Sequence, residues 1–108
     1  MDRAKKIKKF NPLPPFLTIK DSSIHGLGLF ATQKILKNYE LGISHIKDNR
    51  FLHGYIRTPL GGFFNHSESP NCDAIYDNDF IILKTLTTIN LNEEITVNYK
   101  LHSWIIKK

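Results

Sequence analysis

Apolar and β-branched residues gather in several short stretches of this chain, and residues that favour turns separate those stretches. At 16–20 the apolar and polar residues alternate, and side chains in a β-strand point alternately to opposite faces, so these short stretches predict strands. The predicted strands are 16–20, 29–32, 39–46, 80–86 and 95–99. Turns are predicted at 21–23, 77–79 and 90–92, where Asp, Ser and Asn gather.

No stretch keeps an amphipathic helical period over the roughly twelve residues that a core helix needs. The segment 48–52 is the most favourable place for a single helical turn. The chain is therefore predicted to be mainly β. Pattern and composition by themselves favour a small barrel or sandwich of short strands.

The chain has 108 residues, which is enough for one domain with a modest core. Prolines at 12, 14 and 15 separate a basic arm, residues 1–11, from the folded domain, residues 12–108. The net charge of +5 comes largely from the two ends of the chain. We interpret the arm as a solubilising terminus; the alternative is an arm that binds an acidic partner.

The apolar runs are only as long as strands, so no transmembrane helix is expected, and no apolar segment follows the basic arm as a secretory signal requires. Cys72 is the single cysteine. An intrachain disulfide and a cysteine-cluster zinc site are therefore excluded, and no metal is expected. We interpret Cys72 as a buried thiol in the reducing interior of a cell, either the cytoplasm or the inside of a host cell.

Three short motifs follow one another along the chain. They are Gly-x-Gly-x-Phe-Ala at 26–31, Asn-His-Ser-x-x-Pro-Asn-Cys at 65–72 and Glu-Glu-Ile-Thr-Val-x-Tyr at 93–99. In this order the motifs resemble those of the SET-domain protein lysine methyltransferases, which use S-adenosylmethionine as methyl donor. The resemblance runs from about residue 16 to residue 104. The chain has no flanking cysteine-rich segments, and in this respect it is similar to the smallest viral and bacterial members of the family.

This resemblance implies a more specific fold than the pattern does. Members of the family have a β-clip fold of several small curved sheets, in which the C-terminal segment is tucked beneath a preceding loop in a pseudoknot. Threading of this kind is rare among protein folds. The hydrophobic pattern would not have suggested it.

The resemblance also assigns residues to the cofactor and its product S-adenosylhomocysteine. The turn at Gly26, Leu27, Gly28 and Leu29 would approach the methionyl part through its backbone, because glycine has no Cβ to obstruct it. The Asn65 amide would contact the cofactor's amino group, and the backbone at His66 would pair with adenine. Trp104 would either cover the adenine or anchor the C-terminal tail.

Tyr99 resembles the tyrosine whose hydroxyl orients the target amine, and it would also lie beside the cofactor. Tyr39, Tyr55 and Tyr76 are the remaining tyrosines that could line a lysine channel, or they are ordinary half-buried packing. Glu93 and Glu94 would face opposite sides of a strand, so we interpret them as structural and turn-forming rather than as a catalytic pair.

Three positions depart from the usual family pattern: Gly62, where Arg is common, Glu68, where Cys is common, and Asn98, where Asp is common. None of them removes a group assigned to the chemistry. The segment 47–60 is much shorter than in large members, where it forms one wall of the peptide groove. The substrates of the large family members therefore do not indicate the substrate of this chain.

The function expected from the resemblance is methyl transfer from S-adenosylmethionine to a lysine side chain of a protein substrate. So small a domain would gain groove surface as a homodimer. The alternative is an inactive SET-like module that binds peptide or cofactor. A basic nucleic-acid-binding barrel is disfavoured, because the aromatic residues do not gather with the basic ones as a stacking platform requires.

Overall fold

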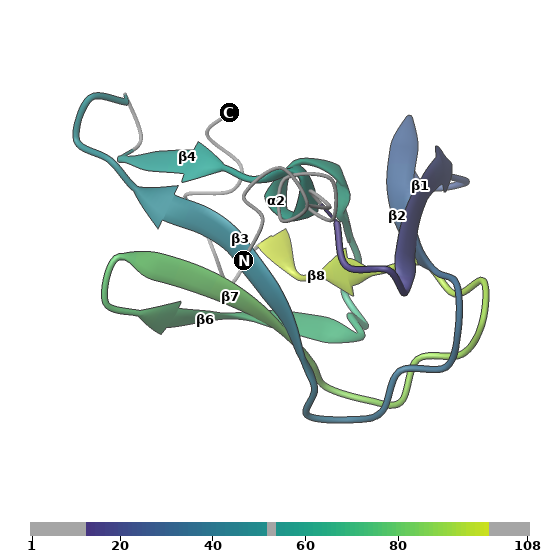
Figure 1. Ribbon diagram of the computed structural model, residues 1–108. Helices are drawn as coiled ribbons and strands as arrows, with labels where there is room; N and C mark the ends of the chain where they lie inside the picture. Colours follow the sequence, from purple (N-terminus) through teal and green to yellow (C-terminus); the bar gives the residue numbers. More distant parts are fainter. Residues whose placement is uncertain (1–12, 52–53, 100–108) are drawn as a thin grey trace, which may run out of the picture.

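The computed structural model describes residues 13–51 and 54–99 of the chain. Its elements are eight short strands and one short helix (Figure 1). In chain order they are β1 (Leu17–Asp21), β2 (Leu27–Ala31), β3 (Glu40–Lys47), β4 (Tyr55–Arg57), the helix α2 (Pro59–Phe63), β5 (Asn65–His66), β6 (Cys72–Asp77), β7 (Phe80–Thr85) and β8 (Thr96–Val97).

The strands form three small sheets. β1 and β2 make an antiparallel hairpin, four strands pair in the order β4-β3-β7-β6, and β5 pairs with β8 in parallel. Figure 1 shows the hairpin on one side of the molecule and the four-stranded sheet on the other, with β8 between them. The prediction of a mainly β fold of several small sheets is confirmed, and the barrel or sandwich that pattern alone favoured is not formed among the described residues.

The four-stranded sheet shows how the alternating direction of side chains along a strand gives it one buried face. In β7, Ile81, Leu83 and Thr85 are buried, whereas the residues between them are partly exposed. Antiparallel β6 meets β7 through the tight turn after Asp77, where Asn78 has a φ of 55°. Asn tolerates this left-handed conformation better than most residues, so the turn predicted at 77–79 is confirmed.

The helix was not predicted. Thr58 caps its first turn by accepting a hydrogen bond from the Gly61 N–H, and Pro59 stands at the helix start, where a missing N–H does no harm. The Thr-Pro pair is a helix-start signal, but the following Gly61 and Gly62 are poor helix formers. At 48–51, where a helical turn was predicted, the chain makes a turn closed by a hydrogen bond from the Phe51 N–H to the Asp48 carbonyl.

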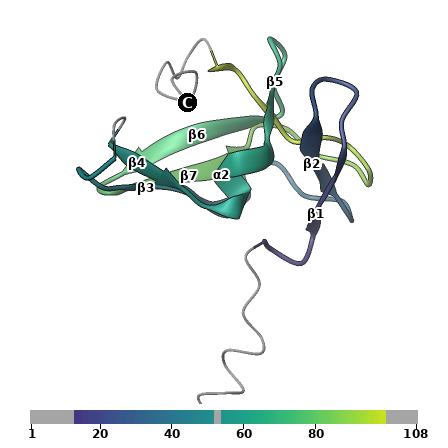
Figure 2. The same cartoon turned by 90° about the horizontal axis from the view of Figure 1, so that it is seen from above.

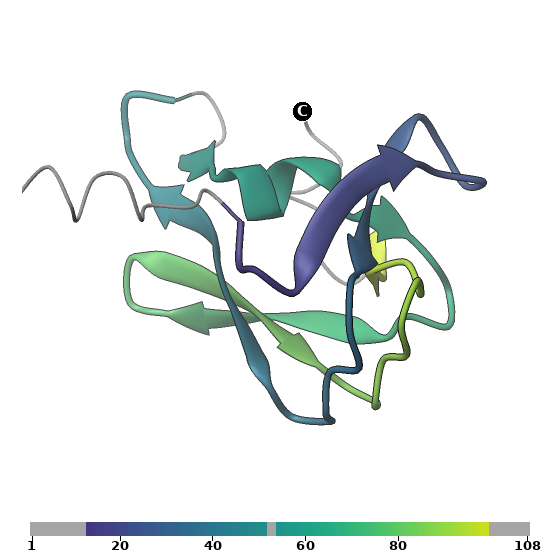
Figure 3. The ribbon, with the colours of Figure 1, turned by 45° about the vertical axis from the view of Figure 1, so that its right-hand side comes forward.

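Gly61 is needed for packing rather than for backbone freedom. A Cβ at this position would overlap the Ser44 carbonyl of β3. The glycine thus lets α2 lie directly against β3, as Figure 2 shows from above and Figure 3 shows obliquely. This close packing sets where the chain leaves the helix and enters β5.

Segment 93–97 crosses the middle of the molecule. One of its edges pairs with two strands in turn: Glu93 O accepts from the Ala31 N–H, the Ile95 N–H donates to Leu29 O, and Val97 O accepts from the Ser67 N–H. β2 and β5 therefore lie end to end along this edge. An isolated bridge between Phe30 and Glu94 marks where β2 meets the segment.

The Asn71 side chain pairs with the opposite edge of segment 93–97. The Asn71 Nδ2 donates to the Glu94 carbonyl at 2.7 Å, and the Asn71 Oδ1 accepts from the Thr96 N–H at 2.9 Å. The loop that begins at Ser67 on one edge thus ends at Asn71 on the other. It passes around the segment, which is the arrangement expected of a pseudoknot.

No helix among the described residues is long and apolar enough to span a membrane. The core is one cluster that joins the hairpin, the four-stranded sheet and segment 93–97. Its fully buried aliphatic members include Leu29, Leu83, Ile89, Ile95 and Val97. Cys72 belongs to this cluster, so its prediction as a buried thiol is confirmed.

Candidate functional site

The three sequence motifs converge at one place because of the pairing around segment 93–97. β5 carries the Asn-His pair and runs parallel to β8, with Asn65 opposite Thr96 and His66 opposite Val97. β2, which carries the Gly-x-Gly turn at its start, meets the same segment at Glu94. Motifs far apart along the chain thus become neighbours.

The Asn65 side chain is the centre of this junction. Its Nδ2 lies 2.7 Å from Glu94 Oε2, 3.1 Å from Ser22 Oγ, 3.1 Å from the His25 carbonyl and 3.2 Å from the Leu27 carbonyl. An amide nitrogen carries two hydrogens and cannot accept, so four surrounding oxygens define which end of the amide is the nitrogen. The orientation of the Asn65 amide is therefore determined by its surroundings.

The other end of the amide is left without a donor. Asn65 is only 7% exposed, and across residues 13–51 and 54–99 no group donates a hydrogen bond to its Oδ1. Buried polar atoms in folded proteins nearly always have a partner, so an exception needs an explanation. This oxygen is suited to accept a hydrogen bond from a ligand that carries an N–H or O–H group.

The turn from Ser22 to Gly26 lies beside this oxygen-rich cluster. The Ser22 N–H donates to the Gly26 carbonyl at 2.8 Å, and the Ser22 Oγ accepts from the Ile24 N–H at 2.9 Å. Gly26 has a φ of +49° and open space where a Cβ would be, so its role is conformational. The exposed Leu27 follows it at the start of β2.

At Gly28 the structure shows a need for glycine that the sequence did not indicate, and the expected approach of its backbone to the cofactor stays a prediction. A Cβ at this position would overlap the Glu94 carboxylate, and it would lie 3.1 Å from the Ser22 Cβ. The space above Gly28 is thus occupied by a side chain of the protein itself. The glycine is required for the approach of Glu94, and Leu29 beside it is a fully buried core residue.

Hydrogen bonds anchor Tyr99 to the residues on either side of Asn65. Its hydroxyl donates to the Phe64 carbonyl at 2.9 Å, and its backbone N–H donates to His66 Nδ1 at 3.0 Å. Its ring meets the Phe64 ring edge-on with centroids 6.1 Å apart, and the His66 ring lies 5.2 Å away. Hydroxyl and ring are therefore held in one place by residues that flank Asn65.

Burial raises the pKa of the Tyr99 hydroxyl above its usual value, with nearby Arg57 lowering it and Glu94 raising it further. A raised pKa means that the hydroxyl stays protonated at neutral pH. Tyr99 can therefore donate or accept hydrogen bonds, but it does not carry the negative charge of a general base. Cys72 is no nucleophile either, because burial, with smaller effects of Glu93 and Asp73, raises the pKa of its thiol to about 12.

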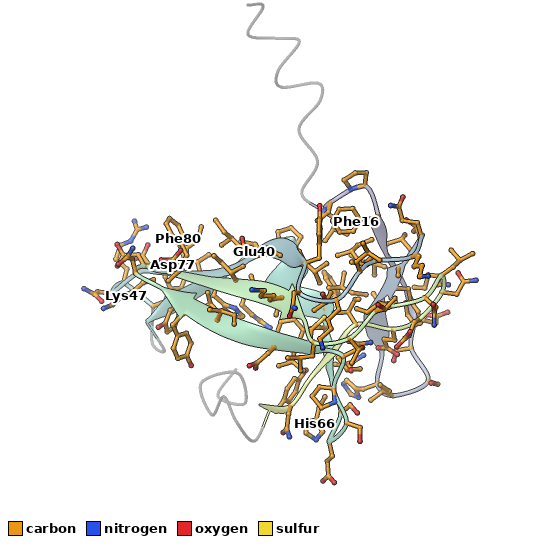
Figure 4. The ribbon with its side chains drawn as sticks, turned by 90° about the horizontal axis from the view of Figure 1, so that it is seen from below. Phe16, Glu40, Lys47, His66, Asp77 and Phe80 are labelled. Carbon is orange, nitrogen blue, oxygen red and sulfur yellow. The ribbon has the colours of Figure 1, made fainter. Side chains whose placement is uncertain are left out.

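His66 accepts a hydrogen bond at Nδ1, so the neutral ring carries its proton on Nε2. Figure 4 shows His66 well apart from Lys47, Asp77 and Phe80, which mark the far end of the four-stranded sheet. The candidate site is thus at the junction of the three sheets. It does not extend to the tip of the β6–β7 hairpin.

The other tyrosines fall in different places. Tyr55 on β4 meets the buried His45 ring edge-on at 6.2 Å, and His45 in turn lies 6.4 Å from Phe64, which contacts Tyr99. Tyr55 therefore belongs to a row of rings that leads to Tyr99, and its assignment to a substrate channel stays a prediction.

Tyr39 and Tyr76 have other recorded surroundings than Tyr55. Tyr39 packs edge-on against Phe16 at 5.5 Å, and Tyr76 on β6 is 56% exposed. Trp104 lies outside the described residues. The roles assigned to these three residues stay predictions.

Three residues of the site were not recognised from the sequence. Ser22 lies in a turn whose composition carries no chemical signal, and Phe64 contributes only a backbone carbonyl. Glu94 was interpreted as structural, together with Glu93. That interpretation holds for Glu93, which accepts from the Asn90 N–H at 2.9 Å and closes the turn predicted at 90–92. It is incomplete for Glu94, whose carboxylate holds the Asn65 amide.

Comparison with known proteins agrees with this geometry. A family model for the SET domain matches residues 43–100, more than half of the 108 residues. No curated protein sequence matched significantly. Among solved structures, a candidate histone methyltransferase of Plasmodium falciparum matches with a TM-score of 0.66 and 23% identity, over 81% of this chain and 95% of that one.

The methyltransferase domain of human PR domain-containing protein 2 matches with a TM-score of 0.64 and 21% identity, over 79% of this chain and 77% of that one. At such identities the likeness shows a shared fold. The structural matches therefore support the same architecture that the three sheets and the crossing segment 93–97 display.

Proposed function

The chain belongs to the SET-domain family, and on that basis we propose that it transfers a methyl group from S-adenosylmethionine to the side-chain amine of a lysine in a protein substrate. The observation that carries the proposal is the buried Asn65 Oδ1, an acceptor without a donor among the described residues, at the junction of all three family motifs.

The residues at the junction fit this cofactor. S-adenosylmethionine supplies a methyl group activated on a sulfonium, and its amino-acid part carries a primary amine. That amine donates hydrogen bonds, which matches the acceptor that Asn65 presents. The backbone from Gly26 to Leu29 and the backbone at His66 are the further candidates to hold it. Gly26 has open space on its Cβ side, so the turn can be approached closely there.

Tyr99 and Phe64 fit the amine that would be methylated. A free lysine amine has a pKa of about 10.4 and is almost wholly protonated at neutral pH, whereas methyl transfer needs its neutral form. A half-buried site beside a positive sulfonium favours the neutral amine. The Tyr99 hydroxyl is itself uncharged and donates its hydrogen to the Phe64 carbonyl, so its oxygen can accept a hydrogen bond from the amine and orient it without adding a negative charge that would favour the protonated form.

The proposal is tested first by binding. S-adenosylmethionine and S-adenosylhomocysteine should raise the melting temperature of the folded protein, because a ligand bound only by the native state stabilises that state. Asn65→Ala should remove most of this shift. Asn90→Ala, a change at an exposed asparagine, should leave it intact. An unchanged melting curve at saturating cofactor, with protein shown to be folded, contradicts the proposed function.

An inactive module with the same fold is the second candidate, since binding alone would not require turnover. Incubation with S-adenosylmethionine labelled in its methyl group and a cell lysate separates the two. A labelled protein band supports the enzyme, and cofactor binding without label supports the module. The homodimer and the reducing cellular compartment expected from the sequence stay predictions.

A further inference from the structure

We propose that Glu94, braced by Ser22, is a positioning residue: it holds the Asn65 amide so that Oδ1 faces the amino group of the cofactor. The inference rests on the proposed function and adds a residue to the cofactor site. It follows from a hydrogen-bonded cluster that joins the turn before β2, the start of β5 and segment 93–97.

Glu94 makes the shortest contact in that cluster. Its Oε2 accepts from the Asn65 Nδ2 at 2.7 Å, compared with 3.1 to 3.2 Å for the other three oxygens around that nitrogen. Hydrogen bonds to an ionised carboxylate are shorter and roughly twice as strong as those between neutral groups. Among the contacts of the Asn65 amide, the one with Glu94 should therefore be the strongest.

Ser22 fixes the carboxylate in turn. Its hydroxyl lies 2.8 Å from both Glu94 oxygens and donates its single hydrogen to them, while its Oγ accepts from the Ile24 N–H and from Asn65 Nδ2. Every hydrogen-bonding capacity of this hydroxyl is used. Ser22 and Glu94 are 72 positions apart in the chain, so the cluster exists only when the sheets have assembled.

The cluster determines which end of the Asn65 amide points to the ligand. The two ends of an amide are nearly identical in shape, so packing alone hardly distinguishes them. Rotating the amide by half a turn would put Oδ1 against the Glu94 carboxylate and against the carbonyls of His25 and Leu27, which are all acceptors. Of these acceptors, only Glu94 carries a full negative charge, so it contributes most to the preference for the observed orientation of the Asn65 amide.

Gly28 supplies an independent sign that Glu94 has this place. Its missing Cβ leaves the room that the carboxylate occupies, and any side chain there would displace it. Glu93, the adjacent acidic residue, instead accepts from Asn71 and from the Asn90 backbone. The two carboxylates therefore have separate tasks, and Glu93 offers a matched control.

The test compares two ligands, of which only one carries the amino group that Asn65 is proposed to bind. S-adenosylhomocysteine carries the amino group, whereas 5′-methylthioadenosine has the same nucleoside and thioether but lacks the amino-acid part. Glu94→Gln keeps the shape and removes the charge. By calorimetry it should weaken S-adenosylhomocysteine binding by ~10-fold, the scale of one hydrogen bond to a charged group, and leave 5′-methylthioadenosine binding unchanged. Ser22→Ala should act in the same direction with a smaller effect.

Glu93→Gln is the control and should bind both ligands as the parent does. If Glu94→Gln binds S-adenosylhomocysteine as tightly as the parent, or loses affinity for both ligands equally, the positioning role is refuted while the proposed function stands. If the folded parent binds neither ligand, the proposed function fails and the positioning role fails with it. Melting temperatures without ligand verify that each variant is folded.

Discussion

Tyr99 shows how much one hydroxyl can be constrained by its neighbours. Its oxygen is anchored on the Phe64 carbonyl, and its backbone N–H is anchored on His66. Both neighbours flank Asn65, the proposed cofactor ligand, so amine and cofactor would be positioned by the same short stretch of chain. Reacting groups that are held in this way gain rate from orientation alone.

Tyr99→Phe removes that oxygen and almost no volume. We expect turnover on a protein substrate to fall by ~10²-fold or more, the scale for loss of a positioned catalytic group. The affinity for S-adenosylhomocysteine should change far less, since Asn65 and its partners are untouched. The lost hydrogen bond to Phe64 should lower stability by only about 1 kcal/mol. Equal rates for parent and variant would show that Tyr99 is packing.

At the scale of elements, the crossing of segment 93–97 depends on Asn71. Backbone pairing with β2 and β5 covers one edge of the segment, and the Asn71 side chain is the group that pairs with the other edge at Glu94 O and Thr96 N. Asn71 is itself buried. Its amide therefore acts in place of a neighbouring strand and holds the loop around the segment.

Asn71→Ala would leave the Glu94 carbonyl and the Thr96 N–H without these partners. Because buried polar groups without partners are costly, we expect the free energy of unfolding to fall by about 2–4 kcal/mol. Asn90→Ala, at an exposed site three residues before Glu93, should change it little. Urea denaturation of the three proteins measures the difference. A loss no larger for Asn71→Ala than for Asn90→Ala would mean that backbone pairing alone holds the segment.

At the scale of the whole molecule, the packed part of the chain extends toward the N-terminus as far as Leu13, close to the boundary expected for the basic arm. Leu13 and Phe16 pack against the core cluster, and the Phe16 carbonyl accepts from the Thr32 N–H at 2.8 Å. The prolines at 14 and 15 therefore lie within the packed part of the chain. The boundary between arm and domain expected at residues 11 and 12 stays a prediction.

Two truncations test this boundary. Deletion of residues 1–9 should leave the melting temperature and the cofactor-induced shift unchanged, because it removes none of these contacts. Deletion of residues 1–16 removes Leu13, Phe16 and the ring contact with Tyr39. It should lower stability by about 2 kcal/mol, the scale for burial of apolar side chains. Loss of folding in the shorter deletion would show that the arm belongs to the domain.

The sequence by itself determined the mainly β character of the chain and the approximate places of β1, β2, β3, β7 and β8. The apolar run that begins at Phe80 predicted β7 because it is as long as a strand and follows the turn signal at 77–79. The resemblance to the family motifs named Asn65, His66 and Tyr99 as candidate site residues, and their roles stay predictions. The helix α2 and the strands β4, β5 and β6 escaped prediction. α2, β4 and β5 are too short to show a period, and neighbouring elements stabilise them. β6 buries only residues of its first half and has an Asp near each end, so its sequence carries little strand signal.

Only the tertiary structure decided how those residues are held. Asn65 meets Ser22 and Glu94 across separations of 43 and 29 positions, and no local pattern encodes which distant side chains will meet. Position 28 likewise needs glycine because the Glu94 carboxylate, which is distant in the sequence, occupies the space where a Cβ would lie. Hydrogen bonds of this kind depend on angstrom-scale geometry, which exists only after the sheets have packed around segment 93–97.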